Sequence, residues 1–115
     1  TGDGGVWYHA TELDTAVRYD IPVVFVVNNN HSLNQERALN EDIYGGQRPG
    51  SDELWHMTDG DFAKMAESMG CFGITVNKVS ELSSALDQAF EAGRPAVVDV
   101  KTHLEGIAPR AWLPS

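Results

Sequence analysis

The sequence predicts an α/β fold of three layers, in which a parallel sheet carries helices on both faces. Three observations lead to this prediction. Mostly apolar segments of strand length, rich in β-branched residues, occur at 21–27, 72–76 and 96–100. Segments with apolar residues at helical spacing alternate with them, and glycine or proline marks most boundaries. Strands that alternate with helices are joined by right-handed crossovers, so the strands run parallel.

The first half of the chain predicts a turn, a helix, a strand and a long connection. Residues 1–5 (TGDGG) form a glycine-rich turn, and apolar residues at helical spacing predict a helix over 6–20. The run IPVVFVV at 21–27 carries no charge, which is typical of a strand buried on both faces. Residues 31–58 are polar and too long for an ordinary connection, so we expect this segment to be functional or mobile. Within it, a short helix is expected over 33–39.

The second half predicts two further helices and two further strands. One helix covers 59–68, with Asp59 or Asp61 as its N-cap. The next is capped by Ser80 and places Phe90 on its apolar face with Leu82, Ala85, Leu86 and Ala89. Strands are expected at 72–76 and 96–100, and an irregular tail from residue 102 onward. Trp7 and Phe25 are expected in the core.

Composition restricts the classes of function. A chain of 115 residues fits one small domain. A formal charge of −9 without any cluster of Lys and Arg argues against nucleic acid and anionic membranes as partners. Cys71 is the only cysteine, so no disulfide can form within the chain, and we expect a reducing, cytoplasmic compartment. No apolar run approaches the ~20 residues of a membrane span.

The sequence has two polar clusters at the ends of predicted elements. One lies at the start of a predicted helix, and the other directly follows a predicted strand. Asp3 lies in the glycine-rich turn, and three asparagines at 28–30 directly follow the apolar strand. In open α/β sheets, ligands bind at the carboxyl ends of the strands, so Asp3 and one asparagine can face a shared point. A turn that opens a helix favours a phosphate, and Mg²⁺ reverses the repulsion between that phosphate and a carboxylate. The dinucleotide and P-loop fingerprints are both incomplete here.

The motif at 2–4, followed by a buried strand and an asparagine pair, resembles the signature of thiamine-diphosphate enzymes. The stretch at 12–23, ELDTAVRYDIPV, is similar to the branch that contains acetolactate synthase, benzoylformate decarboxylase and pyruvate oxidase. Pro22 lies 19 residues after Asp3 and Asn30 lies 27 after it, which are the family's spacings for its proline and its metal-binding asparagine.

The resemblance implies a Rossmann-like fold that binds thiamine diphosphate through Mg²⁺. The implied metal ligands are Asp3, Asn30 and the main-chain carbonyl of Ser32. The implied cofactor-binding residues are Gly2, Gly4, Gly5, His31, Ser32 and Leu33. The chain departs from the family at Gly5, where a small hydroxyl residue is common, and at Asn34, where a glycine is common.

The resemblance also implies what the chain lacks. Residues 1–115 match part of a diphosphate-binding domain that is incomplete at its amino terminus, so we expect a fragment that is inactive by itself. No catalytic residue is assigned here, because the activating glutamate belongs to a pyrimidine-binding domain or partner subunit. The complete enzyme would be a homo-oligomer that decarboxylates or ligates 2-keto acids. The alternative is a stand-alone, non-catalytic α/β module that binds a phosphate or a partner.

Overall fold

A computed structural model describes residues 1–106 of the chain. The part of the predicted tail at 107–115 lies outside the described residues. In chain order the elements are α1 (Asp3–His9), α2 (Glu12–Arg18), β1 (Val24–Asn29), α3 (Asn34–Tyr44), α4 (Ser51–Trp55), α5 (Phe62–Ser68), β2 (Phe72–Val76), the 3₁₀ turn η1 (Val79–Glu81), α6 (Leu82–Glu91) and β3 (Ala96–Lys101).

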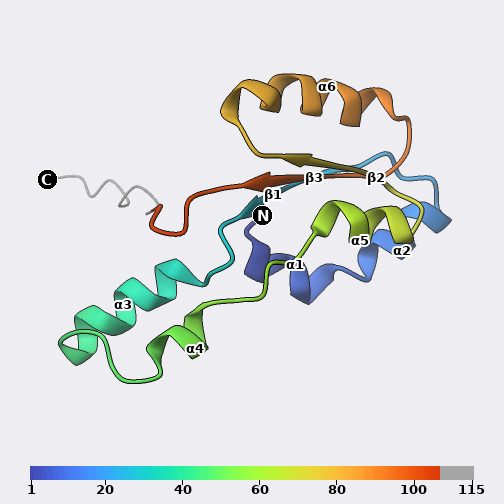
Figure 1. The fold of residues 1–115 in the computed structure, drawn as a ribbon. Coiled ribbons are helices and arrows are strands. Elements are labelled where there is room, and N and C mark those ends of the chain that lie inside the picture. Colours follow the sequence, from blue (N-terminus) through green and yellow to red (C-terminus); the bar gives the residue numbers. More distant parts are fainter. Residues whose placement is uncertain (107–115) are drawn as a thin grey trace, which may run out of the picture.

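The predicted α/β architecture is confirmed. The sheet has three strands in the order β1-β3-β2, and both neighbouring pairs run parallel. Helix α6 covers one face of this sheet, whereas α1, α2 and α5 lie on the other (Figure 1). Helices α3 and α4 stand off from the sheet, beyond the carboxyl ends of the strands (Figure 1). No helix within residues 1–106 is long and apolar enough to cross a membrane.

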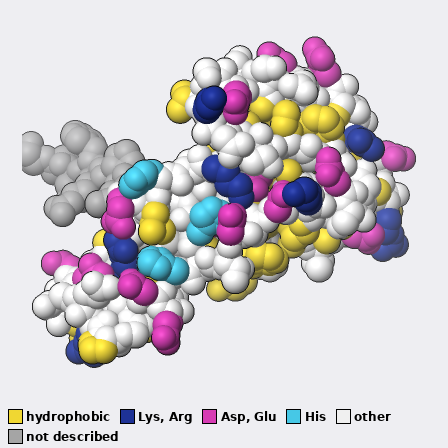
Figure 2. Space-filling view, viewed as in Figure 1, with side chains coloured by type: hydrophobic (Ala, Val, Ile, Leu, Met, Phe, Trp, Pro, Cys, Tyr) yellow, Lys and Arg dark blue, Asp and Glu magenta, His cyan; other side chains and the backbone are white. Residues whose placement is uncertain are grey.

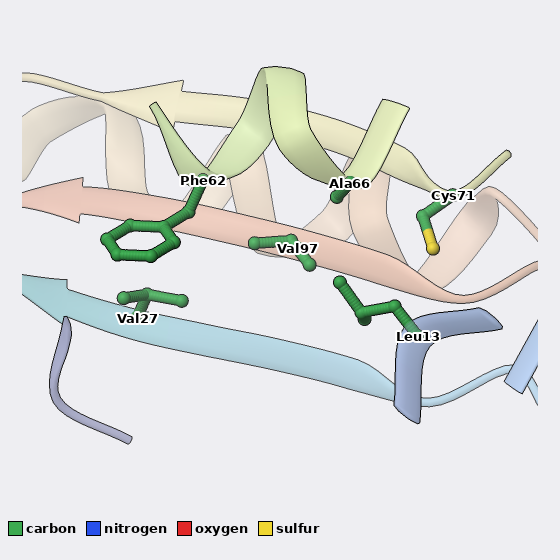
Figure 3. Close-up of a cluster of buried hydrophobic side chains, with 6 residues drawn as sticks. All are labelled: Leu13, Val27, Phe62, Ala66, Cys71 and Val97. Atoms are coloured by element: carbon green, nitrogen blue, oxygen red, sulfur yellow. The ribbon is translucent and has the colours of Figure 1, made fainter. Parts of the chain in front are cut away.

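The core consists of two apolar clusters, one on each face of the sheet. Because successive side chains of a strand point to opposite faces, Val97 of β3 joins one cluster and its neighbour Val98 joins the other. The first cluster, between the sheet and α2 and α5, contains Leu13, Val27, Phe62, Ala66, Cys71 and Val97 (Figure 3). The second, beneath α6, contains Val76, Ala85, Ala89, Ala96 and Val98.

Strand β1 lies at an edge of the sheet and one of its faces is partly open, so the prediction that it is buried on both faces is wrong. Val26 in its middle is 38% exposed, while Ala96–Asp99 in β3 are buried. A strand's own residues do not determine its neighbours, and β3 takes the central place. The chain start lies beside β1: the Thr1 carbonyl accepts a hydrogen bond from the Asn28 N–H at 2.8 Å, and Gly2 forms a parallel bridge to Asn28.

The single helix predicted over 6–20 is instead two, α1 and α2, separated at Ala10 and Thr11. This break lets α1 start beside the end of β1 while Leu13 and Ala16 of α2 reach the core. Trp7 is 53% exposed and was wrongly expected in the core, although its ring packs against Phe62 with centroids 5.2 Å apart. Phe25 is half-buried and packs against the first cluster.

Helix α5 begins later than predicted. Its N-cap is Asp61, whose carboxylate accepts a hydrogen bond from the Lys64 N–H at 2.9 Å, rather than Asp59. In the long connection, α3 runs five residues past the predicted end at residue 39, to Tyr44, and a second helix, α4, follows unpredicted.

The predicted cap of α6 is wrong as well. Ser80 makes no cap bond; instead the Glu81 carboxylate accepts from the N–H groups of Asn77 and Lys78, both at 3.1 Å. Phe90 is 70% exposed, because it follows the buried Ala89 and one residue turns about 100° around a helix. The rest of the predicted apolar stripe faces the sheet.

Candidate metal centre

Two segments far apart in sequence meet at the carboxyl end of β1. The bridge between Gly2 and Asn28 sets the first turn of α1 beside the last residues of that strand. Asp3 thereby becomes buried, with only 4% of its surface exposed. After Asn30 the chain turns sharply at His31, whose φ of 57° is left-handed. This turn folds the following loop back toward Asp3.

The oxygens of Asp3 and Asn30 converge on one backbone amide. Ser32 N–H donates to Asp3 Oδ2 at 3.2 Å and to Asn30 Oδ1 at 3.1 Å. The other carboxylate oxygen, Asp3 Oδ1, accepts from the Gly4 N–H at 2.9 Å. The residues that sequence reasoning proposed as metal ligands are therefore neighbours in space, and their role in binding a metal stays a prediction.

The chemistry of this group fits a hard divalent cation. Within residues 1–106 Asp3 has no ion-pair partner, and a buried carboxylate without a counter-charge is costly. The Ser32 carbonyl accepts no hydrogen bond from the described residues, and the Ser32 hydroxyl is buried without a partner. Mg²⁺ prefers oxygen ligands, and this group offers one carboxylate, one amide oxygen and one carbonyl. Phosphate and water oxygens would complete the octahedral coordination.

Metal binding here would depend on that mixed set of ligands. No group of three or more His, Cys, Asp and Glu side chains that could hold a metal occurs in the described part of the chain. A site built from acidic or histidine side chains alone is therefore absent from residues 1–106. Asp3 is the one charged ligand in the proposed set, which makes it the residue whose loss should matter most.

The remaining predicted cofactor residues surround this point. A Cβ on Gly4 would clash with the Leu33 side chain, so this glycine allows Leu33, itself 39% exposed, to lie over the first turn of α1. A Cβ on Gly5 would lie 2.7 Å from the Thr1 hydroxyl. His31 has its Nε2 at 3.4 Å from Asp59 Oδ1, and its Nδ1 is buried without a partner.

Sequence reasoning missed a buried polar connection behind the site. Asn29 and Asp99 are both 0% exposed, and Asn29 Nδ2 donates to Asp99 Oδ1 at 2.8 Å. Lys101 Nζ lies 3.1 Å from Asp99 Oδ2 and 3.4 Å from Asp59 Oδ1. The sequence did contain a sign of this connection, since the segment AVVDV at 96–100 places one carboxylate inside an otherwise apolar strand.

Other features of the described residues are weaker candidates for a functional site. A hollow of about 540 Å³ lies at the opposite, amino-terminal edge of the sheet, where Phe72, Gln88 and Arg94 line it, and it contains no buried unpaired polar group. Burial raises the pKa of the Cys71 thiol, which makes it a poor nucleophile. On the face drawn in Figure 2, acidic and basic side chains are interspersed and form no continuous basic patch.

Comparison with known proteins identifies the family. A family model described as "Thiamine pyrophosphate enzyme, C-terminal TPP binding domain" matches residues 1–100. The chain belongs to this family. Thiamine pyrophosphate is another name for thiamine diphosphate, so the resemblance read from the sequence is confirmed. The match begins with the turn that carries Asp3 and ends within β3.

Curated relatives include acetolactate synthases and lyases. The chain is 40% identical over 90 residues to the acetolactate synthase large subunit of Haemophilus influenzae, covering 78% of the chain and 15% of that protein. It is 36% identical over 110 residues to 2-hydroxyacyl-CoA lyase of Oryza sativa subsp. japonica, covering 86% of the chain and 17% of that protein. The chain thus spans less than a fifth of the length of these relatives.

Solved structures agree with the fold. A thiamine diphosphate-dependent 4-hydroxybenzoylformate decarboxylase of Rhodococcus jostii RHA1 superposes with a TM-score of 0.79 at 30% identity, covering 90% of this chain and 19% of that one. Benzoylformate decarboxylase of Polynucleobacter necessarius has the same TM-score at 22% identity, covering 91% of this chain and 19% of that one. The second likeness concerns the fold alone.

Proposed function

We propose that the chain binds the diphosphate of thiamine diphosphate through Mg²⁺, as part of an enzyme that decarboxylates or ligates 2-keto acids and resembles acetolactate synthase. The observation that carries this proposal is the convergence of Asp3 and Asn30 on the Ser32 amide, over 3.2 and 3.1 Å. Residues 1–115 would form part of the diphosphate-binding domain. A stand-alone, non-catalytic α/β module that binds a phosphate or a partner is the alternative, and family membership favours the enzyme.

Each residue has a distinct task in this proposal. Asp3 would supply the negative charge that holds the cation, while Asn30 Oδ1 and the Ser32 carbonyl would supply neutral oxygens. Gly2, Gly4 and Gly5 would let the backbone of the first turn approach the diphosphate without side-chain obstruction. Leu33, which lies over Gly4, and His31 would line the cofactor near the metal.

The reactive chemistry would come from the cofactor. When bound, thiamine diphosphate supplies the carbon nucleophile and the electron sink that 2-keto acid chemistry requires. The task of this chain is to fix the cofactor's diphosphate end so that its reactive end stays in one place. Positioning of this kind lowers the activation barrier by removing translational and rotational freedom before the reaction.

The rest of the active site would come from elsewhere. We propose that a pyrimidine-binding domain or a partner subunit carries the activating glutamate, and that the assembled enzyme is a cytoplasmic homo-oligomer. None of Glu12, Glu36 and Glu41 is assigned that role. The relatives' greater length is consistent with this division, since the chain spans only 15% of the first relative named above.

Calorimetric titration of the full-length protein with thiamine diphosphate, with and without Mg²⁺, tests the proposal. Mg²⁺ should strengthen binding, and Asp3→Ala should weaken it by about 10-fold or more, since even groups that merely support a ligand affect affinity by about 10–100-fold. Asp14→Ala, which changes a carboxylate that is 65% exposed, serves as the matched control and should bind normally. Binding that depends on neither the metal nor Asp3 would refute the proposal.

A further inference from the structure

We propose that Asp99 is a positioning residue, which orients Asn29 and through it the turn that carries Asn30 and Ser32. This inference rests on the proposed function, because it explains how the ligand oxygens keep their place. Asp99 lies on the central strand β3, directly across from β1, with its Cα in register with Val27. Its carboxylate makes no hydrogen bond to Asp3, Asn30 or Ser32, so it would act only through Asn29.

Asp99 is a fully buried carboxylate whose oxygens both accept hydrogen bonds. Its Oδ1 accepts from Asn29 Nδ2 at 2.8 Å, and its Oδ2 accepts from the Phe62 N–H at 3.2 Å. Lys101 Nζ, 3.1 Å from Oδ2, supplies the counter-charge. Burial of a charge is tolerated only when it is paired and hydrogen-bonded in this way. Contacts from three elements, β1, α5 and β3, therefore hold this carboxylate in place.

The acceptor-only carboxylate determines how the Asn29 amide is oriented. A side-chain amide has a donor end and an acceptor end, and an ionised carboxylate accepts only the donor. Asn29 Nδ2 therefore faces Asp99, and it also donates to the Gly60 carbonyl at 3.1 Å. The acceptor end, Asn29 Oδ1, is left to face the His31 N–H at 3.4 Å.

That last contact reaches the turn of the proposed metal centre. His31 has a left-handed φ of 57°, which non-glycine residues adopt only when their surroundings hold them there. Its neighbours on either side are Asn30 and Ser32, the residues whose oxygens would hold the cation. Loss of the Asp99 carboxylate would free the Asn29 amide to rotate, and the turn would lose one of its supports.

The test measures metal dependence in the full-length protein. In Asp99→Asn the added amide NH₂ group faces an existing donor, so the buried network cannot be satisfied as before. At a fixed concentration of thiamine diphosphate, the Mg²⁺ concentration that gives half-maximal binding, measured by calorimetry, should rise by about 10–100-fold, the usual effect of groups that orient metal ligands. Amide hydrogen exchange at 30–32 should accelerate more than exchange in α6.

A matched control separates positioning from general stability. Val97→Ala, in the same strand, removes core contacts without touching Asn29, so it should lower the midpoint of unfolding yet leave the half-saturating Mg²⁺ concentration unchanged. Asn29→Ser removes the amide that Asp99 holds, and it provides the same readouts if Asp99→Asn does not fold.

The outcomes distinguish the two proposals. If the wild-type protein binds thiamine diphosphate with Mg²⁺ and both Asp99→Asn and Asn29→Ser retain the wild-type Mg²⁺ requirement, the positioning role is overturned and the proposed function stands. The positioning role is likewise overturned if Val97→Ala raises the Mg²⁺ requirement as much as they do. If the wild-type protein shows no Mg²⁺-dependent binding, both proposals fall together.

Discussion

The Asp3 carboxylate and the Asn30 side-chain oxygen accept hydrogen bonds from the same N–H group, that of Ser32, at 3.2 and 3.1 Å. The two residues are 27 positions apart in the sequence, and they meet because α1 starts beside the end of β1. Their oxygens are thus brought together by the fold itself. A cation held by both oxygens would require this proximity.

Asp3→Asn should reduce the stabilisation of the protein by its cofactor. Wild-type protein with thiamine diphosphate and Mg²⁺ at about 100 times Kd should gain about 2.7 kcal/mol, and a chelator should remove this gain. With binding weakened about 10-fold or more, the variant should gain about 1.4 kcal/mol or less. Without cofactor its stability should change little, because relief of the uncompensated buried charge offsets the cost of the new NH₂ group, which faces an N–H donor. Thermal unfolding with and without the ligands measures both effects, and a variant stabilised as much as wild type would contradict the assignment.

Two phenylalanines should respond very differently to truncation. Phe62 is 2% exposed in the first core cluster, and Phe62→Ala should lower the free energy of unfolding by about 3–5 kcal/mol. Phe90 is 70% exposed, and Phe90→Ala should change that free energy by less than about 0.5 kcal/mol. Urea titration of both variants provides the comparison. Similar losses would mean that Phe90 is covered by something the described residues do not include.

Gly73 should resist substitution because the backbone of α5 crosses it closely. A Cβ at this position would collide with the Ala63 carbonyl, a backbone group that cannot move aside, so Gly73→Ala should cost about 1–3 kcal/mol. Gly60→Ala is the control, since its Cβ would meet the Trp7 ring at an ordinary 3.5 Å. The midpoints of chemical denaturation of the two variants provide the comparison. Equal midpoints would show that the close contact between Gly73 and α5 does not limit substitution.

The Asp61 cap should contribute to stability in a pH-dependent way. The Lys64 side chain, and then its backbone N–H, hydrogen-bond to this carboxylate and lower the pKa of Asp61 from 3.8. A lowered folded-state pKa means that the contribution is complete above 3.8 and is lost as the pH falls through the folded value. Asp61→Asn should keep the cap but lose the ion pair, which contributes little at an exposed position.

Urea denaturation across that pH range measures the effect. The difference between wild type and Asp61→Asn should be present at neutral pH and should shrink as the pH falls below 3.8. Ser80→Ala, which removes a hydroxyl that caps nothing, should differ little from wild type at any pH. A wild-type advantage over Asp61→Asn that persists in acid would contradict the ionic origin.

The sequence was sufficient for the architecture because its signals are local. Strand-length apolar runs and helical spacing lie within single elements, and the positions of β2 and β3 follow from them. The pairing of Asp3 with an asparagine after β1 was also accessible, because carboxyl ends of parallel strands share an edge. The choice of Asn30 over Asn28 and Asn29 came from the family's spacing.

What could not be predicted depends on contacts between distant segments. The edge position of β1 depends on which strand lies between the others, and no residue of Val24–Asn29 encodes that order. The role of Asn29 depends on Asp99, 70 positions away, so it emerges only when β1 and β3 lie side by side. The exposure of Trp7 could not be predicted either, because it depends on the break between α1 and α2.

The most direct measurement of the central claim is the position of the metal itself. Crystals of the full-length protein with thiamine diphosphate, grown with Mn²⁺ in place of Mg²⁺, would reveal the ion by anomalous scattering. We expect one peak at the carboxyl end of β1, in contact with an Asp3 carboxylate oxygen, Asn30 Oδ1 and the Ser32 carbonyl. A peak held by other residues, or a diphosphate bound without contact to that ion, would contradict it.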